Sequence, residues 1–170
     1  QPASGDDGCS YGACLLSHKI QSINYTPKKF FNFYQGSRYS NFQILKSLKK
    51  LKINYNGNSN IYKKTAKYLS EGKIVAWFQD SSEFGPRALG NRSILCKPFP
   101  LKMKDYLNKR VKFREEFRPF APAVLKEFQK EYFDLNQDSY HMLIACKVKK
   151  NKKDKVSAVV HVDDTCRVQT

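Results

Sequence analysis

The sequence predicts a mixed α/β domain, and three observations support this fold class. Residues 61–70 have helical spacing and end at Gly72, and an apolar run over residues 73–79 follows directly. Helical and strand-like segments then alternate through the second half of the chain. With 170 residues, of which 41 % are hydrophobic, the chain is long enough to bury a core.

The first sixty residues predict two helices joined by polar connectors. Residues 1–20 are read as a glycine-containing turn followed by a short apolar helix over residues 11–17. Ser40 is placed to cap a second helix over residues 41–51, with apolar side chains on one face and lysines on the other. The connectors, residues 21–40 and 52–58, contain the proline, glycine and asparagine residues that favour turns.

The elements of the second half follow from residue type. The apolar run over residues 73–79 is typical of a strand buried on both faces. Pro119 and Pro122 exclude a regular helix over residues 117–125, which we expect to be extended. The remaining expectations are helices over residues 101–111 and 126–133, strands over residues 141–148 and 156–162, and a charged turn over residues 149–155.

The formal net charge is +16, and the two basic residue types are distributed differently. The 24 lysines are spread over helix faces and loops, whereas five of the seven arginines lie between positions 87 and 118. Arginine is hard to replace where planar, bidentate geometry is needed. The cluster therefore favours anion recognition, with ordinary surface ion pairs as the alternative reading.

The most informative segment is Glu83–Leu95. It places Arg87 and Arg92 among residue types that form tight turns, namely Gly85, Pro86, Gly90 and Asn91. Because a strand leads into it, we expect an arginine-bearing loop with free backbone N–H groups, which suits a phosphate or carboxylate. A second cluster of basic residues follows within residues 111–122.

Several common sites are absent from the sequence. It has no P-loop and no dinucleotide fingerprint, and the spacing of its histidines and cysteines indicates neither a catalytic triad nor a zinc site. The five cysteines are read as reduced thiols of a cytoplasmic protein. Once these sites are excluded, the candidate functional residues are mostly cationic side chains, with few nucleophiles among them. Such a set suits phosphoryl or nucleotidyl transfer between bound anions.

Six motifs of the chain stand out together. They are Gly5–Gly8 with Gly12 and Ala13, Glu83–Leu95, Val111–Glu115, Phe117–Leu125, His161–Asp163 and Thr165–Gln169. In this order they resemble the signature of the NodU/CmcH carbamoyltransferase family. The resemblance covers most of the chain and is weak over residues 21–58. It implies a YrdC-like α/β fold, a mixed twisted sheet with flanking helices that is incomplete at the C-terminus.

The resemblance also implies a domain organisation. Residues 1–25 would be the tail of an N-terminal actin-like ATPase-type domain, residues 26–58 a linker, and residues 59–170 a truncated YrdC-like domain. The chain does not begin with Met, and the family's metal-binding histidines are expected upstream of it. We therefore expect a fragment that cannot turn over alone.

The implied activity is ATP-dependent O-carbamoyl transfer. The YrdC-like domain would make carbamoyl-adenylate from carbamoyl phosphate and ATP. The N-terminal domain would pass the carbamoyl group to an acceptor hydroxyl with an iron-type divalent metal ion. Matched by position, Asp6 would be a metal ligand. The residues expected to contact ATP, carbamoyl phosphate or the adenylate are Arg87, Arg92, Lys112, Arg118 and Arg167, with Lys112 and Arg118 as the catalytic residues.

The sequence departs from the family pattern near the expected anion site. Asp80 and Ser81 stand where a glycine and often an arginine are usual. Asp164 stands where a glycine is usual, and Cys166 where an alanine is usual. The extra carboxylates could weaken anion binding or alter loop geometry.

Two other functions stay open at this point. One is a basic RNA-binding module related to YrdC-like tRNA-modification proteins, which the charge favours but the core-like placement of the aromatic residues disfavours. The other is a non-catalytic relative that binds an anion as a regulator. The expected partners are small-molecule substrates and an acceptor hydroxyl compound. A membrane partner is not expected, because no apolar stretch approaches ~20 residues, and homodimer formation is left open.

Overall fold

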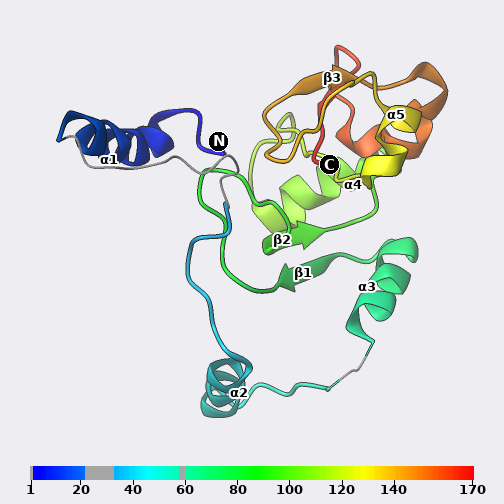
Figure 1. Ribbon diagram of the computed structural model, residues 1–170. Coiled ribbons are helices and arrows are strands. Elements are labelled where there is room, and N and C mark those ends of the chain that lie inside the picture. The colour runs from blue at the N-terminus through cyan, green and yellow to red at the C-terminus, as the bar shows by residue number, and fades with distance from the viewer. Residues whose placement is uncertain (1, 22–32, 58–59) are drawn as a thin grey trace. The chain divides into compact units, whose positions relative to one another are not determined.

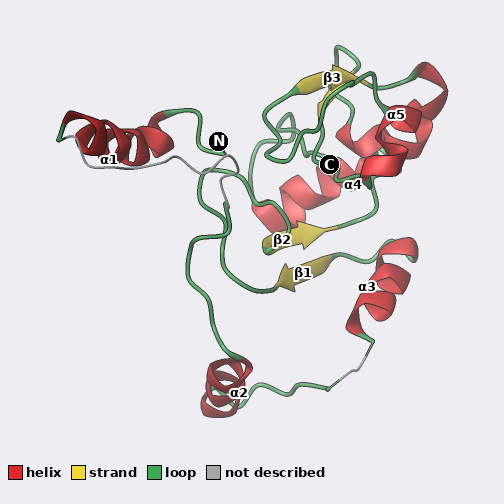
Figure 2. Cartoon of the chain, in the orientation of Figure 1, coloured by secondary structure: helices red, strands yellow, loops and turns green. Residues whose placement is uncertain are grey.

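A computed structural model describes residues 2–21, 33–57 and 60–170 of the chain (Figure 1). The chain divides into two compact units. Unit 1 comprises Gln1–Ile61 and Ala76–Ser93, and unit 2 comprises Tyr62–Val75 and Ile94–Thr170. Helices and strands both occur (Figure 2), so the α/β class is confirmed. Of the predicted linker, residues 26–32 and residue 58 lie outside the described residues.

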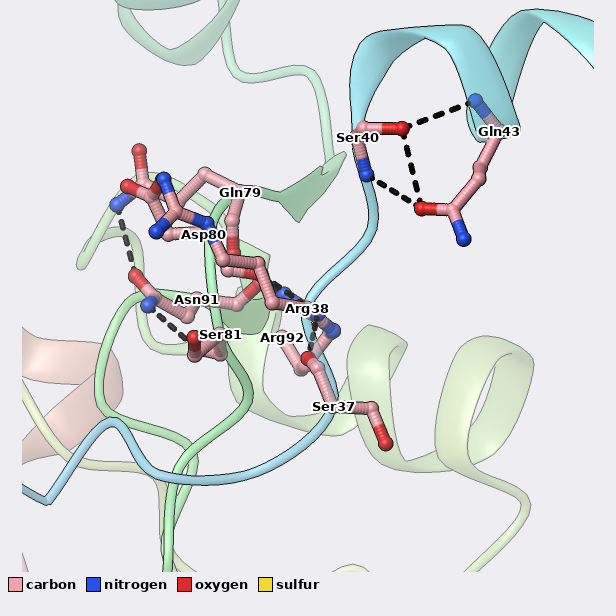
Figure 3. Close-up of polar contacts among 9 residues, drawn as sticks. All are labelled: Ser37, Arg38, Ser40, Gln43, Gln79, Asp80, Ser81, Asn91 and Arg92. Atoms are coloured by element: carbon pink, nitrogen blue, oxygen red, sulfur yellow. Dashed lines mark hydrogen bonds and ion pairs between the residues drawn. The ribbon is translucent and has the colours of Figure 1, made fainter.

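Two helices of unit 1 form where the sequence predicts them. Helix α1 (Cys9–Ile20) follows a short 3₁₀ turn, η1 (Asp6–Gly8), and extends beyond the expected apolar segment at both ends. Helix α2 (Asn41–Lys50) starts at a capping box, in which the Gln43 N–H donates to the Ser40 hydroxyl and the Ser40 N–H donates to the Gln43 side-chain oxygen (Figure 3). The start of α2 is therefore encoded locally.

Strands β1 (Val75–Phe78) and β2 (Arg92–Leu95) form a two-stranded sheet. The prediction that the first strand is buried on both faces is wrong, because Ala76 is exposed and Phe78 has 53 % of its surface accessible. Exposure alternates along β1, as in a strand covered on one face only. Strand β2 was not predicted, because its polar first residues hide the apolar pattern of a strand.

The core of unit 2 surrounds a second two-stranded sheet. Strands β3 (Ala145–Lys147) and β4 (Thr165–Arg167) are antiparallel, and Cys146 lies directly opposite Cys166. The buried core side chains are Phe133, Leu135, Cys146, Val148, Val156, Val159, Cys166 and Val168. A bridge between Ala123 and Gln169 joins the extended segment that contains the prolines to the residues after β4.

The segment Lys150–Val159 corrects two predictions. A charged turn followed by a strand was expected here, but the segment, η4, is 3₁₀-helical on both sides of a kink at Val156, where φ is −134°. Val156 at the kink and Val159 after it are both buried in the core of unit 2. The strand that pairs with β3 is instead β4, further along the chain.

The remaining helices agree with the predicted ones. They are α3 (Ile61–Ser70), α4 (Lys102–Leu107) continued by the π-helical turn η2 (Asn108–Lys112), and η3 (Lys126–Phe128) continued by α5 (Gln129–Tyr132). Gly72 ends the helix before it with a φ of +81°, a conformation that favours glycine. Within the described residues, no helix combines the length and apolar character needed to cross a bilayer.

Candidate functional site

The loop between β1 and β2 is organised by one carboxylate. Oε1 of Glu83 accepts hydrogen bonds from the backbone N–H groups of Leu89, Asn91 and Arg92, at N···O distances of 2.7, 2.8 and 3.3 Å. The expectation of free backbone N–H groups is therefore wrong for these three positions, because the Glu83 carboxylate already accepts a hydrogen bond from each of them. Glu83 thus has a structural role in shaping the loop.

These contacts change the acidity of Glu83. Partial burial raises its pKa, but the backbone N–H donors of Leu89, Asn91 and Arg92 stabilise the ionised form and outweigh it. The pKa of Glu83 therefore lies below its ordinary value of 4.5. At neutral pH this carboxylate is ionised and holds the loop by charge-assisted hydrogen bonds.

Arg92 is held by backbone carbonyl groups. Its Nη1 donates to the carbonyls of Gln79 and Asn91, and its Nη2 to those of Ser37 and Asp80 (Figure 3). The guanidinium carbon also lies 3.6 Å from the ring centroid of Phe78. Four carbonyls match the four terminal N–H groups, so Arg92 would have to exchange some of these bonds to contact a substrate anion.

Asn91 and Gln79 complete the support of this loop. Asn91 is buried, and its Nδ2 donates to the carbonyl of Ser81 at 2.7 Å. The Gln79 Nε2 in turn donates to the Asn91 Oδ1 at 2.9 Å. Sequence reasoning treated Asn91 only as a turn former and missed this pair. The sequence itself shows only an asparagine directly before Arg92, which does not reveal the pairing.

Arg87 is held differently from Arg92. It is partly buried, and its Nε is a buried nitrogen with no hydrogen-bond partner among the residues that the structure describes. No ion pair with a carboxylate is formed by Arg87 in that part of the chain. A buried guanidinium nitrogen without an acceptor is costly. Of the two loop arginines, Arg87 is therefore the one that an external anion would satisfy.

Asp6 lies at the start of η1 and is exposed. The described residues contain no group of three or more histidine, cysteine, aspartate or glutamate side chains arranged to hold a metal ion. The residues on this part of the chain therefore do not by themselves fit the expected metal centre. Asp6 could supply one ligand at most.

Lys112 and Arg118 lie on one helix-and-loop segment of unit 2. Lys112 is the last residue of η2 and is exposed. Arg118 lies in the following loop, where its Nη1 is 3.8 Å from Oε2 of Glu115 and both side chains are mostly exposed. Exposed pairs of this kind contribute little, so an anion could take the place of Glu115 at small cost.

Arg167 is the last residue of β4 and pairs with Ala145 of β3. It is half-buried beside Cys166, which is fully buried. The structure thus places Lys112, Arg118 and Arg167 in unit 2, and Asp6, Arg87 and Arg92 in unit 1.

The departures from the family's glycines coincide with left-handed backbone. Asp80 has a φ of +39° and Asp164 a φ of +66°, where glycine is the unstrained choice. Each aspartate forms an ion pair, Asp80 with Arg38 at 3.7 Å and Asp164 with Lys153 at 2.6 Å. The two carboxylates are therefore partly neutralised by neighbouring cations.

We expect Asp164→Gly to keep or slightly raise thermal stability. Relief of the left-handed strain offsets both the greater chain entropy of glycine and a weak exposed ion pair. Asp164→Val should instead cost about 1–2 kcal/mol, because a β-branched residue is disfavoured at positive φ. Thermal unfolding of the full-length protein measures both variants. A valine variant as stable as the glycine variant would show that the strain is absent.

Residues 66–170 match the family model of the carbamoyltransferase C-terminus. The whole chain is similar to nodulation protein NolNO of Sinorhizobium fredii, at 36 % identity over 179 residues and 26 % of that protein's length. It is also similar to nodulation protein NolO of Bradyrhizobium diazoefficiens, at 36 % identity over 180 residues and 32 % of its length.

A shorter match has a higher identity. The chain is similar to nodulation protein U of Rhizobium tropici at 44 % identity over 105 residues. This match covers 62 % of this chain and 18 % of that protein. The chain thus spans no more than about a third of the length of these relatives, with shares of 26 % and 32 % for NolNO and NolO.

Proposed function

This chain belongs to the NodU/CmcH carbamoyltransferase family, and we propose that it is the part of an ATP-dependent O-carbamoyltransferase that forms carbamoyl-adenylate from carbamoyl phosphate and ATP. The observation that carries the proposal is the match of residues 66–170 to the family's C-terminal model. The partly buried Arg87 in the same stretch, whose Nε has no acceptor among the described residues, supports it.

The proposed reaction joins two highly charged substrates. Carbamoyl phosphate, ATP and water would give carbamoyl-adenylate, pyrophosphate and phosphate. The acceptor hydroxyl would then attack the carbamoyl carbon and release AMP. The phosphate groups repel each other, so positioning and neutralisation by fixed cations would supply much of the rate enhancement.

The basic residues would share this task. Lys112 and Arg118 would act on the reacting carbamoyl and phosphate groups, because both are exposed and only weakly engaged. Arg87, Arg92 and Arg167 would hold the phosphates, each charge-assisted hydrogen bond contributing roughly 1.5–3 kcal/mol. Asp6 would give one ligand to an iron-type metal ion, which would serve the transfer step. The acceptor would be a hydroxyl compound.

Pyrophosphate release by the purified full-length protein tests the proposal. We expect release from ATP only when carbamoyl phosphate is supplied. Acetyl phosphate, in which a methyl group replaces the amino group, should give little or none. Release that is independent of carbamoyl phosphate, or no release from a well-folded protein, would refute the proposed activity.

The net charge of +16 keeps an RNA-binding function as the competing candidate. That function predicts tight tRNA binding whose affinity falls steeply between low and moderate salt. Titration of labelled tRNA at both salt concentrations, run beside the pyrophosphate assay, separates the two. Affinity that does not change with salt, or weak binding throughout, counts against the RNA-binding function.

A further inference from the structure

A buried amide lies at the junction of α4 and η2. The side chain of Asn108 is fully buried. Its Nδ2 donates to the carbonyls of Glu116 at 3.1 Å and Arg118 at 3.0 Å, and its Oδ1 accepts from Nε of Arg114 at 2.7 Å. Its backbone carbonyl also accepts from the Arg114 N–H at 3.0 Å. One residue thus ties three positions of the next loop to the helix.

The backbone around Asn108 is unusual as well. Residues Asn108–Lys112 form a π-helical turn, and the N–H of Phe113 closes it by donating to the Asn108 carbonyl. Phe113 then takes a left-handed conformation, with φ of +49°, and reverses the chain. Single π-helical turns occur frequently at functional sites. The Arg114 guanidinium also lies 4.6 Å from the ring centroid of Phe120, so the reversed loop is fixed at both ends.

We propose that Asn108 is a positioning residue that holds the loop bearing Arg118 at a fixed place relative to the helical turn bearing Lys112. The inference rests on the proposed function of Lys112 and Arg118. Both cations have exposed side chains, so packing does not place them. Asn108 instead fixes the backbone at both positions. Lys112 ends the helical turn that Asn108 begins, and the side-chain amide of Asn108 donates to the carbonyl of Arg118.

The chemistry of asparagine suits this position. A short side chain must donate twice and accept once within one buried space. Aspartate would set a carboxylate against the two carbonyls of Glu116 and Arg118, while keeping the contact with Arg114. Leucine would fill the space but leave two carbonyls and a guanidinium nitrogen without their partner. The two substitutions therefore perturb the loop in different ways.

Gln129 offers a matched control. It is also buried, and its Nε2 donates to the carbonyls of Leu135 and Gln137, both at 2.9 Å. It ties a different loop of unit 2, one that bears none of the proposed substrate-binding residues. Gln129→Leu therefore removes the same kind of buried amide with no expected effect on the positions of Lys112 and Arg118.

The test compares Asn108→Asp, Asn108→Leu and Gln129→Leu in the full-length protein. We expect both Asn108 variants to lower kcat/KM for carbamoyl-phosphate-dependent pyrophosphate release by about ten- to a hundredfold, and Gln129→Leu by less than about threefold at a similar loss of melting temperature. Hydrogen exchange should show faster exchange over residues 113–119 in the Asn108 variants only. Where Asn108→Leu fails to fold, the near-isosteric aspartate variant decides.

The outcomes separate this inference from the proposed function. Faster exchange over residues 113–119 with unchanged kinetics overturns the positioning role and leaves the carbamoyl-adenylate activity standing. Equal kinetic losses in the Asn108 and Gln129 variants also overturn it, because general destabilisation would then explain both. A wild-type protein without carbamoyl-phosphate-dependent release refutes the proposed function instead, while the exchange data still report whether Asn108 holds the loop.

Discussion

Arg87→Ala is expected to reduce carbamoyl-phosphate-dependent pyrophosphate release by the full-length protein by about a hundredfold or more. Arg87 is partly buried, and its Nε has no acceptor among the residues that the structure describes. A substrate phosphate would supply that acceptor, and the alanine variant would lose both the charge and the fork of donors. The loss should appear in kcat/KM, with little change in melting temperature, because no described hydrogen bond of the fold is removed.

Two further variants make this result specific. Arg87→Lys keeps the charge but not the planar geometry, so it should recover only part of the activity. Arg110→Ala removes an arginine that is exposed and to which no substrate role is assigned, and it should retain nearly full activity. If Arg110→Ala and Arg87→Ala lost equal activity, net charge would explain the effect. Full activity of Arg87→Ala would exclude its role in binding.

Glu83→Ala is expected to destabilise the loop between β1 and β2 by about 2–4 kcal/mol, because three backbone N–H groups lose a charged acceptor at once. Hydrogen exchange at Leu89, Asn91 and Arg92 measures this directly, and protection should fall by at least about tenfold. Glu83→Gln keeps an acceptor oxygen without the charge and should show a smaller loss. Glu127→Ala removes an exposed glutamate of unit 2 and should leave this loop unchanged.

The same carboxylate predicts a dependence on pH. The pKa of Glu83 is lowered in the folded protein, so its contribution to stability is fully present above its ordinary value of 4.5. The contribution is lost as the pH falls below 4.5 and through the lowered pKa. Protection of the three amides, corrected for intrinsic exchange rates, should decline over this acidic range in the wild type. In Glu83→Gln it should be nearly flat, and a parallel decline in both would contradict the assignment.

Local sequence signals predicted much of the fold. The capping box at Ser40 and Gly72 at the end of α3 are short-range features, and both lie where expected. The segment Lys150–Val159 was misread because Val156, Ala158 and Val160 alternate with other residues as they would in a strand. Its burial is set by the core of unit 2, which no local pattern shows.

The candidate site shows the same division between local and long-range information. The loop at Glu83–Leu95 and its two arginines stand out in the sequence. The sequence does not show that backbone carbonyls bind Arg92, whereas the Nε of Arg87 has no acceptor among the described residues. Arg92 is held partly by the carbonyl of Ser37, a contact between positions far apart in the chain. Asn108 was missed because a single asparagine within a predicted helix carries no signal until the fold brings residues 114–118 beside it.

The carboxylate of Glu83 also affects how a ligand would arrive. An anion-binding loop that becomes ordered only when its ligand binds loses conformational entropy in that step, which weakens the observed affinity. Here the Glu83 carboxylate accepts from the N–H groups of Leu89, Asn91 and Arg92, so the loop can take its shape before any ligand is present. Encounter with a substrate would then need no slow closure of this loop, and its association rate would be set mainly by diffusion and electrostatic steering.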